Sequence, residues 1–125
     1  MRGVDLKLDA IFVYYKRLAK VRNFVEENYQ NRITLECAAG IAGLESKYFS
    51  AFFHKKTGIC FRQWLSGYRV NQAVIRINAQ NYSITEVAYL VGFQDLRTFE
   101  RAFKFHVGMT PSQFKKSVQD GIHYE

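Results

Sequence analysis

The side chains most able to carry out chemistry in this chain are two cysteines, three histidines and one pair of adjacent carboxylates. The histidines, at positions 54, 106 and 123, have no ligand spacing with one another or with a cysteine, as a zinc site would require. Glu26 and Glu27 are neighbours in a helix-like stretch, so their side chains point about 100° apart and form part of a solvated face. The motifs of serine hydrolases, zinc proteases, P-loop enzymes and dinucleotide-binding enzymes are absent. We therefore expect no metal, no cofactor and no enzymatic activity, and we expect Cys37 and Cys60 to be reduced thiols packed within helices.

The charge of the chain points instead to a polyanionic partner. Lys and Arg number 18 against 11 Asp and Glu, which gives a formal net charge of +7. Such an excess favours nucleic acid or anionic lipid. No window reaches the roughly 18 apolar residues of a membrane span, and no signal peptide opens the chain. A cytoplasmic protein without a membrane partner is the expectation.

Composition predicts a packed, mostly helical molecule. The 125 residues are enough for about one domain, and 48% of them are hydrophobic. With 11 Phe and 8 Tyr, the aromatic content exceeds that of disordered chains. One proline and no Gly/Ser-rich stretch leave little room for an all-β fold full of turns.

An internal repeat organises the elements. Residues 33–64 recur at 82–114, with an offset of 49 that becomes 50 after one extra residue in a turn. Apolar and glycine positions agree while most others differ, which is what one scaffold with two different surfaces would give. The matched pairs are Leu35/Ile84, Ala39/Ala88, Gly43/Gly92, Leu44/Phe93, Phe49/Phe99, Phe53/Phe103, Gly58/Gly108, Gln63/Gln113 and Trp64/Phe114.

Each copy is predicted to be a short helix, a tight turn at a glycine, and a second helix that ends at another glycine. In the second copy, Ser83 with Glu86 and Thr110 with Gln113 have the spacing of capping boxes, and Asp95 can cap the helix between them.

The first copy is less ideal. Thr34 can cap a helix near 35–42, but Gly40 lies inside that helix and costs it roughly 1 kcal/mol relative to alanine. A long connecting helix is expected from Phe61 to about residue 80, and an amphipathic helix is expected to open at about residue 18. The secondary structure of residues 1–15 is ambiguous.

Two runs of the sequence, GFQDLRTFERAFK at 92–104 and GMTPSQF at 108–114, closely resemble the signature of the AraC/XylS family of bacterial transcription regulators. The resemblance covers about residues 18–117. It implies an all-α, homeodomain-like fold of about seven helices, in which a long helix joins two helix-turn-helix subdomains. The corresponding boundaries are an N-terminal arm or linker remnant at 1–17, a first helix-turn-helix subdomain at 18–58, the connecting helix at 59–81, and a second subdomain with a C-terminal tail at 82–125.

The function that this resemblance implies is sequence-specific binding of double-stranded DNA, with two recognition helices in adjacent major-groove segments. An activator is expected, because the family mostly recruits RNA polymerase. A monomer is expected, because most members dimerise through a separate preceding domain. The chain would then be either a short stand-alone regulator or the C-terminal portion of a longer one.

By position, the resemblance assigns base reading to the first turns of the two recognition helices. Arg97 can form a bidentate bond to guanine. Glu100, which matches Ser50 in the repeat, can accept from a cytosine or orient Arg97. The predicted base-reading residues are Lys47, Ser50 and Ala51 in the first copy, and Leu96, Arg97, Glu100 and Arg101 in the second.

The first copy departs from the family pattern. Ala51 stands where a longer polar residue is common, and Glu45 replaces the usual serine or threonine cap. Weaker or shape-based reading by this copy is expected. A protein-binding module that has lost DNA specificity is the alternative, and salt-dependent DNA binding would separate the two.

Other residues are expected to bind phosphates or to support the fold. The predicted phosphate contacts are Lys55, Lys56, Arg62, Lys104, Thr110, Ser112, Lys115 and Lys116, with help from amides at helix starts. Arg69 can brace the helices without touching DNA. The repeated aromatic side chains are expected in the core: Phe49, Phe53, Trp64, Phe93, Phe99, Phe103 and Phe114.

Overall fold

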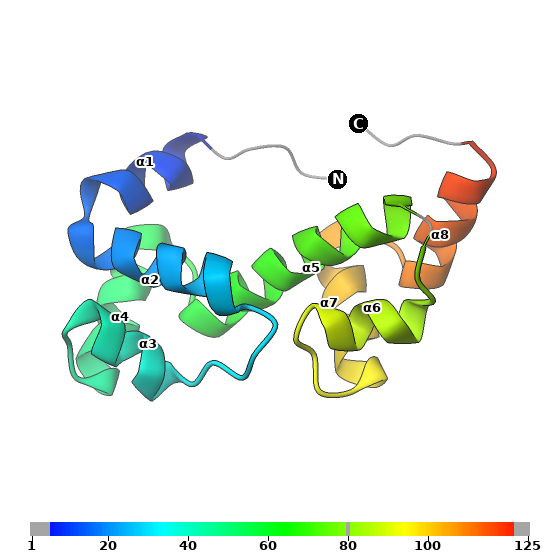
Figure 1. Ribbon diagram of the computed structural model, residues 1–125. Helices are drawn as coiled ribbons and strands as arrows, with labels where there is room; N and C mark the ends of the chain where they lie inside the picture. Colours follow the sequence, from blue (N-terminus) through cyan, green and yellow to red (C-terminus); the bar gives the residue numbers. More distant parts are fainter. Residues whose placement is uncertain (1–5, 80, 122–125) are drawn as a thin grey trace. The chain divides into compact units, whose positions relative to one another are not determined.

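The computed structural model describes residues 6–79 and 81–121, and every regular element in that part of the chain is an α-helix (Figure 1). The all-α prediction is therefore confirmed. The helices are α1 (Leu6–Tyr14), α2 (Lys16–Asn28), α3 (Leu35–Ala42), α4 (Ser46–Thr57), α5 (Phe61–Ala79), α6 (Ile84–Leu90), α7 (Leu96–Val107) and α8 (Pro111–Gln119). No helix among the described residues is long and apolar enough to cross a lipid bilayer.

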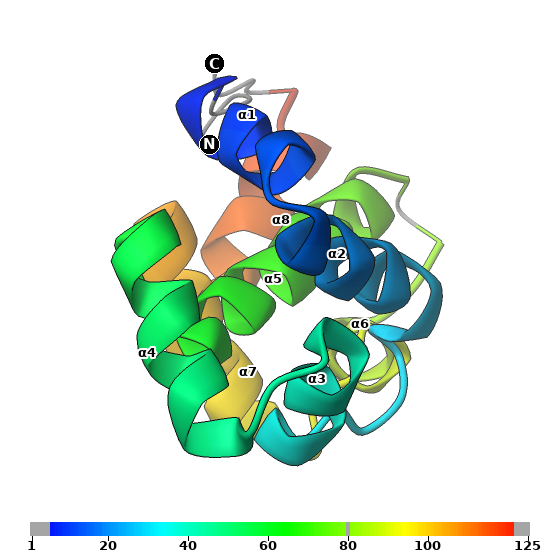
Figure 2. The ribbon, with the colours of Figure 1, turned by 90° about the vertical axis from the view of Figure 1, so that its left-hand side faces the viewer.

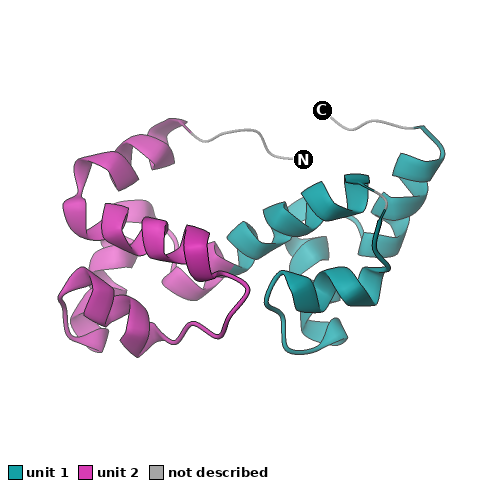
Figure 3. Ribbon diagram, in the orientation of Figure 1, with its two compact units in different colours: residues 1–2, 66–125 teal, residues 3–65 magenta. Residues whose placement is uncertain are grey.

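The chain divides into two compact units, coloured separately in Figure 3. The N-terminal unit comprises residues 3–65 and the C-terminal unit residues 66–125, so the division falls within α5. The boundaries predicted from the sequence at 17/18, 58/59 and 81/82 stay predictions.

The N-terminal unit is built around aromatic side chains. In this unit α2 contacts both α1 and α3, and α3 contacts α4 (Figure 2). The ring of Phe53 lies 5.4 Å from that of Phe61 and 5.7 Å from that of Trp64, centroid to centroid. The buried apolar residues are Phe12, Leu18, Val21, Val25, Ala38, Ala39, Ala42, Phe49, Phe53, Phe61 and Leu65.

The C-terminal unit repeats this core with matched rings. Phe99 lies 5.3 Å from Phe93 and 5.7 Å from Phe103, and Phe103 lies 5.8 Å from Phe114. Six of the seven repeated aromatic side chains are buried, as predicted, while Trp64 is half-buried. The buried apolar residues are Val70, Ala73, Val74, Ile77, Val87, Ala88, Val91, Phe93, Phe99, Phe103 and Phe114.

The helices that the resemblance implied for about residues 18–117 correspond to α2–α8, which number seven. The stretch left ambiguous in the sequence contains an eighth helix of the described residues, α1. Phe12 of α1 is 1% exposed. Its ring stacks on Trp64, with centroids 5.0 Å apart, and lies edge-on to Phe53 at 6.0 Å. Helix α1 therefore contributes to the core of the N-terminal unit.

The cysteine prediction was wrong in one respect. Cys37 and Cys60 are free thiols, as expected, but both are exposed instead of packed. Cys37 lies in the first turn of α3 and Cys60 directly precedes α5, so neither lies on the buried stripe of a helix.

Candidate nucleic-acid interface

Helices α3 and α4 are joined by a three-residue turn that a glycine makes possible. Thr34 caps the start of α3, where its hydroxyl accepts a hydrogen bond from the Cys37 amide at 3.0 Å. At the other end Gly43 has φ 75°, in the left-handed region. Its amide donates to Gly40 O at 3.0 Å, and the Leu44 amide donates to Ala39 O at 2.9 Å. These bonds close α3 and direct the chain into α4.

The glycine and the hydrogen bonds of this turn recur between α6 and α7, where the connection is residues 91–95. Gly92 has φ 103°, and the Phe93 amide donates to Ala88 O at 3.0 Å, in the positions that match Leu44 and Ala39. The start of α6 carries the predicted capping box, in which the Ser83 hydroxyl and the Glu86 carboxylate each accept a backbone amide. Both copies of the repeat therefore present a second helix after a short, closed turn, as helix-turn-helix motifs do.

The two second helices differ at their first turn. Asp95 caps α7 by accepting from the Thr98 amide at 2.7 Å and from the Thr98 hydroxyl at 2.9 Å. Glu45 stands at the same place before α4 and its side chain makes no capping bond. The start of α4 therefore lacks the side-chain cap that α7 has, as the replacement of serine or threonine by Glu45 indicated.

Electrostatics at the start of α7 favour a charged carboxylate beside two arginines. The hydrogen bonds from the Thr98 amide and hydroxyl lower the pKa of Asp95, and the nearby Arg101 and Arg97 lower it further. Both arginines are exposed, and they lie one helical turn apart on the same face of α7. They present two cations at the N-terminal end of the helix.

The structure places the predicted base-reading residues on two exposed helix starts, one in each unit. Within the described residues no ion pair joins Glu100 to Arg97, so both side chains project separately. The exposed members are Lys47 and Ala51 on α4 and Arg97, Glu100 and Arg101 on α7, while Ser50 and Leu96 are half-buried.

Of the predicted phosphate contacts, three have partners within the chain. The Lys56 ammonium lies 4.9 Å from the Tyr15 ring centroid and 5.9 Å from that of Phe52. Lys115 donates to the carbonyl of Tyr82 at 3.4 Å. Thr110 forms the capping box of α8 with Gln113. The remaining five, Lys55, Arg62, Lys104, Ser112 and Lys116, are exposed.

Arg69 of the connecting helix α5 is half-buried, and this burial lowers its pKa. It has interaction partners within the chain. This environment fits the bracing role that the resemblance implied.

Sequence reasoning missed two exposed side chains on α4. Tyr48 is 65% exposed, and His54 is also exposed. With Lys47 and Ala51, His54 follows the helical spacing of one exposed stripe. The repeat carried the signal for both, because Tyr48 matches the polar Thr98 and His54 matches Lys104.

A comparison with protein families matches residues 38–117 to a model described as a helix-turn-helix domain. The regulator RipA of Corynebacterium glutamicum is 34% identical to this chain over 99 residues, which is 79% of this chain and 30% of RipA. The chain belongs to the AraC/XylS family of transcription regulators.

A second relative supports the same family assignment. The melibiose operon regulatory protein of Escherichia coli is 26% identical over 102 residues, or 82% of this chain and 34% of that protein. This AraC/XylS chain therefore spans about a third of the length of these relatives.

Solved structures show the same fold. The DNA-binding domain of AdpA, determined in complex with a target DNA, superimposes with a TM-score of 0.77 at 26% identity and covers 82% of this chain and 93% of that one. The C-terminal domain of the response regulator yesN from Fusobacterium nucleatum gives a TM-score of 0.70 at 31% identity, covering 76% and 93%. The expected AraC/XylS fold is thereby confirmed.

Proposed function

We propose that this chain binds double-stranded DNA in a sequence-specific manner and regulates transcription through that binding. The observation that carries the proposal is the duplicated arrangement of a closed turn followed by a helix whose start exposes polar or charged side chains, α4 in one unit and α7 in the other. Such a helix fits the major groove of B-DNA and reaches base edges from its first turns.

The α7 helix is the stronger reader. Arg97 lies beside the N-terminus of the helix and is exposed, so its guanidinium can donate two hydrogen bonds to O6 and N7 of a guanine. Arg101 follows one turn later and reaches a base or a phosphate. Glu100 accepts from a cytosine amino group on the same stretch of groove.

The side chains with which α4 contacts bases are smaller and less polar than those of α7. Ala51 can contact only the methyl group of a thymine, and Lys47 supplies one hydrogen-bonding cation at the helix start. The negative charge of Glu45 stands at the same end of α4 and opposes DNA phosphates. We expect the half-site read by α4 to tolerate more base changes than the half-site read by α7.

Activation by recruitment of RNA polymerase is the mode of regulation that we propose. The relatives named as operon regulators, of which the melibiose regulator is one, support a role in regulating transcription. One chain carries both recognition helices, so we propose that it binds its site as a monomer. Because genomic DNA is its target, a bacterial cytoplasm is the compartment that we propose.

The decisive experiment selects binding sites from a random duplex library, and then titrates the selected and a scrambled duplex at several salt concentrations. We expect a preference of about 10³ or more, with affinity that falls steeply with salt, and two motifs in one duplex. Binding without preference would leave a non-specific DNA binder. No binding at low salt would contradict the proposal and favour a protein partner.

Arg97→Ala tests the proposed base contact of α7 in the same selection and titration. Loss of a bidentate contact should cost about 1–3 kcal/mol and relax the base preference at one position of one motif. Asn71→Ala, an exposed polar position on α5 outside the predicted contacts, is the control and should leave both motifs unchanged. An equal loss on selected and scrambled duplexes would show that Arg97 binds only phosphate.

A further inference from the structure

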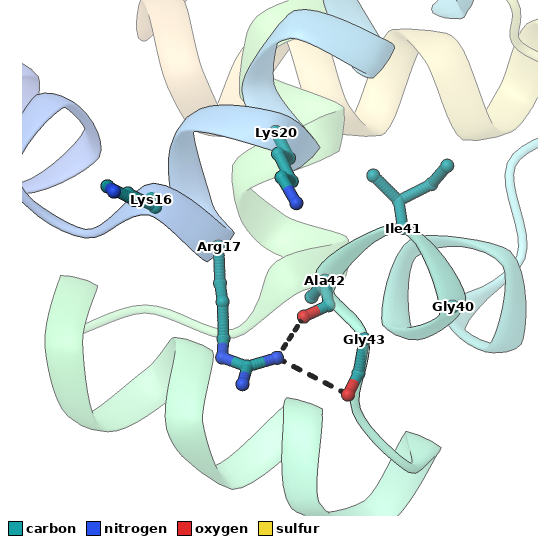
Figure 4. Close-up of a pocket in the computed structure, with 7 residues that line it drawn as sticks. All are labelled: Lys16, Arg17, Lys20, Gly40, Ile41, Ala42 and Gly43. Carbon is teal, nitrogen blue, oxygen red and sulfur yellow. Dashed lines mark hydrogen bonds between the residues drawn. The ribbon is translucent and has the colours of Figure 1, made fainter.

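Helix α2 and the end of α3 line a solvent-open pocket. Neither the repeat nor the family resemblance indicated it. Three cationic side chains of α2 and four consecutive residues of α3 and its turn line it: Lys16, Arg17, Lys20, Gly40, Ile41, Ala42 and Gly43 (Figure 4). None of these lining residues is acidic. Lys20 points toward the end of α3, while the Lys16 side chain points away from it (Figure 4).

Arg17 neutralises the negative end of α3. Its Nη1 donates to Ala42 O at 2.6 Å and to Gly43 O at 3.3 Å (Figure 4). A side chain at residue 43 would obstruct this approach, because a Cβ there would lie 2.9 Å from Nη1 of Arg17. The carbonyls of Ala39 and Gly40 are already bonded to amides of the turn. The carbonyls that would repel an anion are thus largely engaged.

Positive charge remains available in the pocket. Within the described part of the chain, Nε and Nη2 of Arg17 and the Lys20 ammonium have no hydrogen-bond partner. The Asp9 and Glu26 carboxylates of the same unit pair with Arg22 and do not line the pocket. Arg17 and Lys20 can therefore donate to a ligand.

Gly40 supplies an independent observation. It lies inside α3, where glycine is unfavourable relative to alanine, yet a Cβ at this position would meet nothing within 4 Å. Internal packing therefore does not require a glycine there. Gly40 is itself one of the residues that line the pocket, so the missing side chain leaves the backbone of α3 uncovered there.

We propose that this pocket binds a phosphate group through Arg17 and Lys20. Guanidinium and ammonium groups together are the usual partners of phosphate oxygens. The turn at Gly43 continues through Leu44 and Glu45 to Ser46, where α4 begins and next to which Lys47 is exposed. In the DNA complex of the proposed function, the ligand is then a backbone phosphate beside the half-site read by α4.

Two measurements test the pocket, and the first uses no DNA. Amide chemical shifts of the full chain are followed by NMR as inorganic pyrophosphate is added at low salt. We expect saturable shifts at residues 40–43 that are lost in Gly40→Gln, because the new side chain fills the pocket. Gly40→Gln should melt at the same or a higher temperature than the original chain, which separates a ligand role of Gly40 from a structural one.

The second measurement is the salt dependence of DNA affinity in Lys20→Gln, with Lys7→Gln as the control. Lys7 is an exposed lysine of the same unit outside the pocket, so both variants change the net charge equally. If a DNA phosphate occupies the pocket, Lys20→Gln lowers the slope of log affinity against log salt by about one relative to Lys7→Gln.

The outcomes separate the pocket from the proposed function. Equal slopes with saturable pyrophosphate shifts would assign the pocket to a free phosphorylated molecule. If the chain binds no duplex at all, the proposed function fails and the pyrophosphate titration alone decides the pocket. Equal slopes without shifts at residues 40–43 would overturn the phosphate site.

Discussion

Asp95 holds the start of α7 with both of its carboxylate oxygens, which bond to the amide and hydroxyl of Thr98. The same carboxylate faces Arg97 and Arg101 closely enough that they help to lower its pKa. One side chain therefore fixes the helix start and sets the electrostatic surroundings of the proposed guanine reader.

This arrangement predicts a defined pH dependence. Because the folded pKa of Asp95 is below its ordinary value of about 3.9, the ionised form stabilises the fold above that pH. The stabilisation is lost as the pH falls through the folded pKa. We expect Asp95→Asn to melt below the original chain at about pH 6, with the difference shrinking at acid pH. A difference that stays constant in thermal melts across this range would contradict the prediction.

Caps at the residue scale were predictable because they depend on neighbours three positions away. Thr34, Ser83, Asp95 and Thr110 all cap as predicted. The partners of lysines were not predictable, since Lys56 meets Tyr15 and Lys115 meets the Tyr82 carbonyl across long sequence separations.

At the scale of elements, α4 is the recognition helix with the weaker start, because Glu45 does not cap it. Glu45→Ser supplies an acceptor for an unpaired amide of the first turn and should stabilise the chain by about 1 kcal/mol in urea unfolding. Glu45→Gln removes the charge without supplying a good cap, so it serves as the control. Equal stability of the two variants would show that capping contributes nothing here.

Helix α1 is predicted to be an integral part of the N-terminal unit. Phe12 is fully buried against Trp64 and Phe53, whereas its neighbour Val13 is 69% exposed. Phe12→Ala should cost about 3 kcal/mol of unfolding free energy, because it leaves a cavity in the aromatic cluster. Val13→Ala on the same helix should change stability by less than about 0.5 kcal/mol. Similar small losses for both would mean that α1 does not support the core.

The sequence could predict seven helices but not α1, and the reason lies in its pattern. Leu6, Val13 and Tyr14 are exposed while Phe12 is buried, so apolar side chains surround the helix and mark no single face. In α7, by contrast, Phe99 and Phe103 stand one turn apart between charged residues, which makes the buried face evident. The pocket beside Gly40 was also not predictable, because it forms only when α2 meets α3.

On the scale of the whole molecule, the proposed DNA readers are divided between two compact units. Lys47 lies in the N-terminal unit and Arg97 in the C-terminal unit. We expect the losses of binding free energy in Lys47→Ala and Arg97→Ala to add in the double variant to within about 0.5 kcal/mol, as independent sites do. Affinities for the selected duplex at one fixed salt concentration test this, and a larger deviation would indicate that the two readers are coupled.

Trp64 is the single tryptophan of the chain, and it stacks on Phe12 within the N-terminal unit. Its indole emission therefore reports the melting of that unit and not of its repeated counterpart, where Phe114 takes the matched position. Far-ultraviolet ellipticity follows the helices of both. Comparing the two optical signals in one sample gives the melting order of the two halves without any label or substitution.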